Sequence, residues 1–263
     1  MKRTRMAKMA GSIATRVLAP AEVYKLCKSL DEDWPKTMQN LRQSLGEEMI
    51  KKPRKFVKIL GNEFEDFIST VIPRHFYIWS GRSKPLHGKS CVRHEHDLVI
   101  YRWDLKEFPL ILECKVRTKG EITLNDIMAF NMKVADIYHS HRIQKYEESL
   151  NVKFVDLYRV FVTNAPIEEK AQFFATGFGI LTVQPLDRFF PNVAASIYKL
   201  EKFMPEERLL KMKRFHKKLY ALYDLSFRGH KASTKKIFNG EKLNAIVRQH
   251  YNVVNSMVKG KET

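Results

Sequence analysis

Two apolar runs rich in aliphatic residues, 98–103 and 109–116, constrain the fold more than any other feature of this sequence. Only residues 104–108 separate them. Such a short break between two β-prone runs predicts an antiparallel β-hairpin. The second run is continuously apolar from Pro109 to Leu112, which is typical of a strand buried on both faces. We therefore expect a sheet whose two faces are covered by helices.

The segments before the hairpin supply a first helix and a first strand. Apolar residues recur at helical spacing from Phe64 to Ile72, and Pro73 then ends the pattern. This spacing predicts a short amphipathic helix. Residues 76–79 favour a strand, and a loop containing glycine, serine, lysine and proline follows over 81–90.

The segments after the hairpin alternate between helix and strand. Thr123 to Asp126 has the form of a capping box, which opens a predicted helix of about four turns. The elements that follow are a strand over 158–163, a helix over 168–176 ended by Gly177 and Gly179, and a strand over 180–183. A strand, helix and strand of this length usually form a right-handed parallel crossover. The predicted order is αβββαβαβ, an α/β fold with a mixed β-sheet flanked by helices.

Positive charge is concentrated at the two ends of the chain. Residues 1–60 carry 14 Lys and Arg against 6 Asp and Glu, and residues 201–263 carry 15 against 6. These ends are therefore +8 and +9, so the middle of this +18 chain is nearly neutral. We expect a basic helical N-terminal extension over 1–60, a core over 61–200 and a basic helical C-terminal extension over 201–263, with the basic cluster 51–55 as a linker. Such ends indicate a polyanionic partner, because each neutralised phosphate releases condensed counterions.

Several features favour an intracellular protein without a membrane segment. The cysteines Cys27, Cys91 and Cys114 lie far apart, lack zinc-ligand spacing and are typical of reduced thiols. There is no apolar run of about eighteen residues and no G-x-x-x-x-G-K-[ST] motif, so we expect no membrane span and no ATP bound by this chain. The basic stretch 1–20 suits a transit peptide or, as we prefer, an arm that touches phosphate. The expected location is the cytoplasm, in association with a nucleoid or in a viral or archaeal setting.

Chemically active side chains occur at the ends of the two predicted hairpin strands. Asp97 opens the first strand, and Glu113, Cys114 and Lys115 lie near the end of the second. In an antiparallel hairpin centred on Leu105, Asp97 lies directly opposite Glu113. Strand alternation places Glu113 and Lys115 on one face and Cys114 on the other, in the core. The sequence therefore predicts two carboxylates and an ammonium group that converge at one place on the sheet.

These three side chains suit the hydrolysis of a phosphodiester bond. Carboxylates are hard oxygen ligands for Mg²⁺, which keeps several waters and also binds phosphate oxygens. The ion polarises the phosphate and lowers the pKa of a bound water. Lys115 would orient that water and offset the charge that develops on phosphorus. Glu113 also interrupts an apolar strand, where a charge is costly without a strong partner such as a metal.

A structural interpretation competes with this catalytic one. Asp97 and Glu113 could form a cross-strand ladder of ion pairs with Lys115 or Arg93, a common surface device. The nearby histidines, His94 and His96, occupy alternate positions and so share a strand face. We expect them to border the site or contact phosphate rather than to bind a metal.

These residues resemble the pattern of the PD-(D/E)xK nuclease superfamily, specifically its archaeal Holliday-junction resolvase and Mrr-like restriction branches. Asp97 matches the isolated acid of the family, 113–115 matches its E-x-K, and 61–65 matches the helix that contributes a further Glu. The resemblance covers residues 61–185, and the order of predicted elements agrees with it. The sequence departs from the pattern at His96, which stands where the family name has Pro.

The resemblance implies a restriction-endonuclease-like core and a role for each matching residue. By it, Asp97, Glu113 and the backbone carbonyl of Cys114 bind Mg²⁺, and Mn²⁺ is able to substitute. Lys115 serves the attacking water, and Glu65 assists from the helix. A homodimer is also implied, since symmetric pairing suits two-strand cutting.

We therefore expect a magnesium-dependent nuclease that hydrolyses DNA, with endonuclease cleavage favoured over exonuclease cleavage. Two alternatives stay open, a catalytically inactive nucleic-acid-binding protein on the same fold and an RNA-processing protein. The candidate nucleic-acid contacts are Lys119, Asn131, Lys133, Lys213 and Arg214. For the first three of these, a solvated helix face is the competing interpretation.

Overall fold

The computed structural model describes residues 18, 20–73, 76–80, 86–102, 104, 109–138, 147–148, 151, 157–186 and 188. The predictions made for 1–17 and for 201–263 lie outside these residues. Lys213 and Arg214 are among the positions affected.

The described residues form an α/β fold around a mixed five-stranded sheet with the strand order β1-β4-β5-β6-β7. The strands are β1 (Phe76–Ser80), β4 (Leu98–Arg102), β5 (Leu110–Lys115), β6 (Tyr158–Thr163) and β7 (Leu181–Val183). The helices are α2 (Pro20–Glu32), α3 (Trp34–Ile50), α4 (Pro53–Val71), α5 (Leu124–Tyr138) and α7 (Glu169–Phe178). Strands β1, β4 and β5 pair antiparallel, whereas β5, β6 and β7 pair parallel. The predicted α/β class is confirmed.

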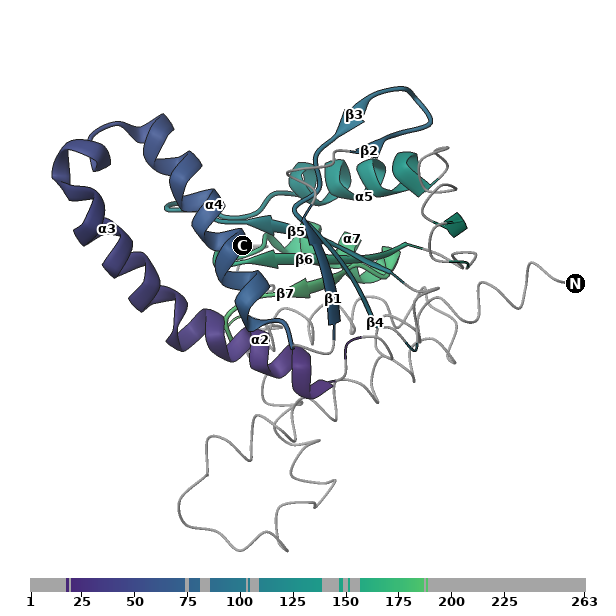
Figure 1. The fold of residues 1–263 in the computed structure, drawn as a ribbon, viewed down its shortest axis with the longest axis horizontal. Helices are drawn as coiled ribbons and strands as arrows, with labels where there is room; N and C mark the ends of the chain where they lie inside the picture. The colour runs from purple at the N-terminus through teal and green to yellow at the C-terminus, as the bar shows by residue number, and fades with distance from the viewer. Residues whose placement is uncertain are drawn as a thin grey trace, which may run out of the picture.

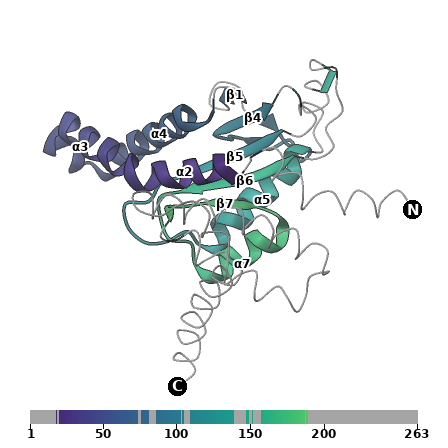
Figure 2. The ribbon, with the colours of Figure 1, turned by 90° about the horizontal axis from the view of Figure 1, so that it is seen from below.

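Helices cover both faces of the sheet and produce three layers (Figure 1, Figure 2). Helices α2 and α4 pack on one face, and α5 and α7 pack on the other. The side chains of β5 alternate accordingly. Leu110, Leu112 and Cys114 join the core of the first face, and Ile111 joins the core of the second. Strand β5 is therefore buried from both sides, as its unbroken apolar run predicts.

The register of the β4–β5 hairpin is the one that the sequence predicts. Leu98 pairs with Leu112, and Ile100 pairs with Leu110. Continuing this antiparallel register by one residue brings Asp97 opposite Glu113.

The predicted start of α5 and the predicted end of α7 are also present. Asp126 accepts a hydrogen bond from the Thr123 backbone N–H at 2.9 Å, and the Thr123 hydroxyl accepts one from the Asp126 N–H at 3.4 Å. These reciprocal bonds form the expected capping box. Gly179 caps α7 with a φ of 73°, in the left-handed region that favours glycine. Gly177, expected to stop this helix, lies within it.

The linker predicted at 51–55 is wrong over 53–55, because α4 begins at Pro53 and continues without interruption through Gly61, and only Lys51 and Lys52 lie between α3 and α4. Proline suits the first turn of a helix, where its missing N–H has no intrahelical partner. Pro53, which lies within the predicted linker, therefore starts the helix. Phe56 and Leu60 are buried and extend the apolar stripe of the predicted helix towards its N-terminus.

Helices α2 and α3 of the predicted N-terminal extension pack onto the same core as the sheet. Leu26 and Leu30 of α2 belong to the cluster that contains the sheet residues of this face. The ring of Trp34 in α3 lies against Phe64 and Phe67 of α4, with centroids 4.7 and 5.3 Å away. None of the helices in the described part of the chain combines the length and apolar character of a membrane span.

A short ribbon occupies part of the predicted loop over 81–90. Strand β2 (Leu86–His87) pairs antiparallel with β3 (Arg93–His94), and the ribbon lies beside α5 (Figure 1). Its turn is bonded to that helix, since the Lys89 N–H donates to the Asp136 carbonyl at 3.0 Å. Gly88 lies at this contact, where an added Cβ would come within 1.7 Å of an Asp136 carboxylate oxygen. Only glycine fits there without displacing Asp136.

Candidate functional site

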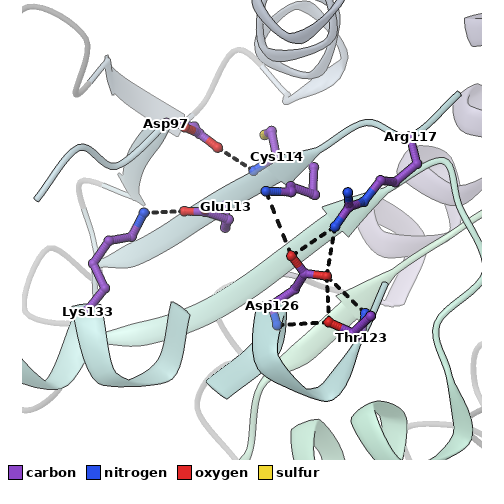
Figure 3. A network of polar contacts seen from close by, with 8 residues as sticks. Asp97, Glu113, Cys114, Arg117, Thr123, Asp126 and Lys133 are labelled. Atoms are coloured by element: carbon purple, nitrogen blue, oxygen red, sulfur yellow. Dashed lines mark hydrogen bonds and ion pairs between the residues drawn. The ribbon is translucent and has the colours of Figure 1, made fainter. Parts of the chain in front are cut away.

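Asp97 and Glu113 lie at the place where β4 begins and β5 ends. Asp97 directly precedes β4, and its carboxylate accepts a hydrogen bond from the Cys114 backbone N–H at 2.5 Å (Figure 3). Cys114 itself is 8% exposed, and its side chain lies in the core as predicted. The hydrogen bond ties Asp97 to the neighbouring strand, next to Glu113.

The Asp97 carboxyl is destabilised in its charged form. Burial, followed by the negative charges of Glu113 and Glu65, raises the pKa of Asp97 from 3.8 to about 7. The Cys114 N–H and the Lys133 ammonium oppose this shift without cancelling it. Two other acids therefore act on Asp97 at this site, and a cation bound beside it would favour its ionised form.

Glu65 reaches this site from α4, which packs on the sheet face opposite α5. It is partly buried and follows Phe64, whose side chain is fully buried in the core. The packing of α4 thus leaves Glu65 at the border of the apolar stripe, close enough to raise the pKa of Asp97. The structure brings the predicted helix acid into electrostatic range of the predicted strand acid.

The ion-pair partner of Glu113 is Lys133 of α5 (Figure 3). The structural interpretation, a cross-strand ladder of ion pairs, required Lys115 or Arg93 in this place. The Lys133 ammonium contacts a Glu113 carboxylate oxygen and also donates to the Glu95 carbonyl at 2.6 Å. The Lys133 side chain is only 16% exposed. Lys133 therefore belongs to the carboxylate site, and the competing interpretation, a solvated helix face, does not hold for it.

Lys115 is paired with Asp126 at the start of α5. Its ammonium nitrogen lies 3.8 Å from an Asp126 carboxylate oxygen. Arg117 donates to both oxygens of the same carboxylate, at 3.0 and 2.9 Å (Figure 3). The Lys115 side chain is 42% exposed, so it remains accessible from solvent. Lys115 thus shares the β5 face of Glu113 but is held by a different acid.

The segment that precedes Asp97 is bonded to α5 at two residues of the helix, Lys133 and Asp136, which lie about one helical turn apart. The first is the contact with Lys133. At the second, Asp136 lies 2.6 Å from the His94 Nε2 and accepts a hydrogen bond from the Ser90 hydroxyl at 2.6 Å. These bonds from Ser90 and His94 lower the pKa of Asp136 to about 2. Asp136 is therefore ionised at neutral pH, where it keeps its contacts with Ser90 and His94.

His96 lies immediately before Asp97 and is 1% exposed. Burial, followed by the charge of Lys133, lowers the pKa of His96 to about 4. The imidazole is therefore neutral at physiological pH and adds no charge to the carboxylate site. His96 borders the site as expected, whereas His94 is engaged by Asp136.

The donors at this site suit a hard divalent cation. Asp97 and Glu113 present carboxylate oxygens, and Mg²⁺ needs only one or two protein carboxylates because it keeps several waters. Burial and the negative charges of Glu113 and Glu65 raise the pKa of Asp97, and a bound divalent ion would offset that cost of ionisation. In the part of the chain that the structure describes, no group of three or more His, Cys, Asp or Glu residues gathers at metal-binding spacing.

The remaining predicted contacts are less closely tied to the site. Lys119 is exposed after β5, and Asn131 is partly buried on α5. Sequence reasoning missed the pairing of Lys133 with Glu113, although a signal was present. Lys133 follows Phe130 by three residues and precedes Ile137 by four, which is the spacing of the buried stripe of α5. A cation at that spacing indicates a buried acidic partner.

No protein-family model and no curated protein sequence matches the chain. Among solved structures, it is similar to the crystal structure of a protein of unknown function, AF1548. The two share 17% sequence identity over 69% of this chain and 90% of that chain, with a TM-score of 0.33. A likeness this distant identifies neither the fold family nor the function.

Proposed function

We propose that this protein is a metal-dependent nuclease that hydrolyses DNA phosphodiester bonds on a restriction-endonuclease-like core. The observation that carries the proposal is the position of Asp97 next to Glu113 across β4 and β5, with Lys115 two residues further along. The order α4-β1-β4-β5-α5-β6-α7-β7, with the β2–β3 ribbon inserted, supports the proposed core. Endonuclease cleavage by a homodimer is the form that we expect.

The proposed chemistry assigns a role to each residue of the site. Asp97 and Glu113 hold one divalent ion together with the backbone carbonyl of Cys114, and Glu65 adds negative charge from α4. Mg²⁺, when bound, supplies a polarised phosphate and a water of lowered pKa. Lys115 orients the attacking water and offsets negative charge that develops on the phosphate. Its partly exposed side chain is accessible to a substrate, and the ion pair with Asp126 limits its freedom.

Basic residues outside this site are proposed to bind backbone phosphates. The exposed cations around the turn between α3 and α4 are Lys51, Lys52, Arg54, Lys55 and Lys58. Positive side chains are unfavourable at a helix N-terminus, which already carries partial positive charge, and α4 has no acid in its first turn. This arrangement costs helix stability and suits a polyanionic partner.

A cleavage panel in Mg²⁺ tests the proposal on single-stranded, duplex and branched DNA and on RNA. We expect DNA cleavage that stops in chelator, and a loss of about 10²- to 10⁴-fold in the Lys115→Ala variant, the range for a positioned group that assists proton transfer. DNA binding by this variant should persist, since the substitution leaves the basic cluster intact. Absence of metal-dependent cleavage of every substrate by the wild type would contradict the proposal. Cleavage of RNA alone would change the substrate class.

The ion pairs of the site favour a second candidate, a nucleic-acid-binding protein on this fold that does not cut. Lys133 neutralises Glu113, while Lys115 and Arg117 both contact Asp126. The Asp97→Ala variant separates the two candidates. A nuclease loses cleavage and keeps binding, whereas the binding protein has no metal-dependent cleavage to lose.

A further inference from the structure

Lys133 brings an ammonium group into direct contact with Glu113, a proposed metal ligand. The same ammonium donates to the Glu95 carbonyl at 2.6 Å, in the segment just before Asp97. Both side chains of the ion pair are shielded, with 16% of Lys133 and 21% of Glu113 exposed. Removing one partner from a shielded ion pair leaves an uncompensated charge, which is more costly than at the surface.

The packing of α5 enforces this contact. Phe130, Val134 and Ile137 are buried against the sheet, so the rotation of the helix about its axis is fixed. Lys133 directly precedes Val134 and projects towards the end of β5 (Figure 3). Its second acceptor, the Glu95 carbonyl, is a backbone group that does not depend on the Glu113 side chain. Lys133 can therefore remain near the site when Glu113 changes partner.

The neighbouring cations, Lys115 and Arg117, both contact Asp126. The Lys115 ammonium lies 3.8 Å from Asp126, and Arg117 donates to both oxygens of the same acid. Of these three cations, Lys133 is the one that contacts Glu113. Its removal would leave Glu113 and Asp97 to repel each other with less compensation, and the pair would then attract a divalent ion more strongly.

We propose that Lys133 is a resident counter-ion that holds Glu113 in the protein without metal, and that a divalent ion binds by exchange with the Lys133 ammonium. This inference rests on the metal site of the proposed function. Exchange breaks the Lys133–Glu113 ion pair and forms a Glu113–metal contact, while the Glu95 carbonyl retains the displaced ammonium. Lys133 is thus a positioning residue that stabilises the metal-free protein and weakens metal affinity.

The inference predicts that one substitution raises the affinity for metal and lowers the stability of the metal-free protein. Lys133→Met removes the charge and keeps a side chain of similar length. Its affinity for Mg²⁺ and Mn²⁺ should rise by about three- to tenfold, because the competing cation is gone. Its melting temperature in chelator should fall by several degrees, because Glu113 loses its partner. A lysine with a merely structural role would, on removal, weaken metal binding along with stability.

The test measures metal affinity by calorimetry and melting temperature with and without metal, on the full chain. The variants are Lys133→Met, Lys133→Arg, which should behave like wild type, and Lys170→Met, an exposed control on α7 that should change neither quantity. Lys133→Gln provides a second neutral variant in case the first does not fold, since its amide can still donate to the Glu95 carbonyl.

The outcomes separate this inference from the proposed function. Tighter metal binding by the neutral Lys133 variants, with a lower melting temperature in chelator, supports the inference. Binding by the variants but not by wild type overturns the exchange, because Lys133 then blocks the site and no ion displaces it. Wild-type binding and cleavage with unchanged or weaker binding by the variants overturns the inference alone. Absence of divalent binding by every form overturns both the inference and the proposed function.

Discussion

Asp97 and Glu113 face each other one step beyond the pair Leu98 and Leu112, and the Cys114 backbone N–H bonds the Asp97 carboxylate across the two strands. This relationship places two acids in a partly buried site. Burial and the neighbouring negative charges raise the pKa of Asp97 to about 7. Ionisation of Asp97 therefore costs more free energy in the folded, metal-free protein than in the unfolded chain.

Asp97→Asn is expected to stabilise the metal-free protein at pH 8 by about 1–2 kcal/mol. Because the folded pKa of Asp97 lies above its unfolded value of 3.8, stability falls as pH rises from about 4 to about 7. Asparagine keeps an oxygen that accepts the Cys114 N–H but carries no charge. Urea unfolding in chelator measures the difference, which should vanish near pH 4. An equal gain at both pH values would show that charge is not the cause.

The cleavage rate at limiting Mg²⁺ is expected to rise with pH until about pH 7 to 8. Protonated Asp97 cannot bind a metal, and below a pKa of about 7 its ionised fraction grows about tenfold for each pH unit. Saturating Mg²⁺ should move the midpoint to lower pH, because the ion favours the carboxylate. Initial rates on one DNA substrate at low and high Mg²⁺ check this. A rate independent of pH at limiting metal would contradict it.

Gly88→Ala is expected to destabilise the protein by about 1–3 kcal/mol, as overpacking does in a tight contact. The added methyl would meet the Asp136 carboxylate at 1.7 Å and displace the ribbon from α5. Since the ribbon leads into the segment that carries Asp97, cleavage should fall as well. Gly61→Ala is the matched control, because nothing lies within 4 Å of its added Cβ. That helix-interior change should stabilise by about 0.5–1 kcal/mol.

Replacing Lys51, Lys52, Arg54 and Lys55 with glutamine is expected to weaken DNA binding without changing its metal dependence. The dependence of log K on log salt concentration should become shallower by about 0.9 for each phosphate that the variant no longer neutralises. Lys170→Gln, an exposed change on α7, should leave the slope unaltered. Fluorescence anisotropy over a salt series measures both. An unchanged slope in the fourfold variant would place the phosphate-binding residues elsewhere.

The strand elements were predictable because their patterns allow few alternatives. Successive side chains of a strand point to opposite faces of the sheet, and a short connection between two strands leaves little choice of register. The pairing of Leu98 with Leu112 follows from those two constraints. The capping box at Thr123 was predictable for a similar reason, since it depends on residues three apart in the chain.

The extent of α4 and the partners of the charged residues were harder to predict. Lys51 to Lys55 has the composition of a linker, and only Phe56 and Leu60, spaced by four, indicate that Pro53 starts a helix. The Lys133–Glu113 and Asp136–His94 contacts join a helix to strand residues. They depend on the position of α5 along the sheet. The helical spacing of a residue indicates that it is buried, but it does not indicate which strand residue lies opposite.

The most direct test of the account is the stoichiometry and affinity of Mn²⁺ binding to the wild type, Asp97→Asn, Glu113→Gln and the double variant. One shared ion predicts one site per chain in the wild type, a loss of at least about tenfold in affinity in either single variant, and little further loss in the double variant. Both single variants binding Mn²⁺ as the wild type does would contradict the claim that Asp97 and Glu113 hold a common ion.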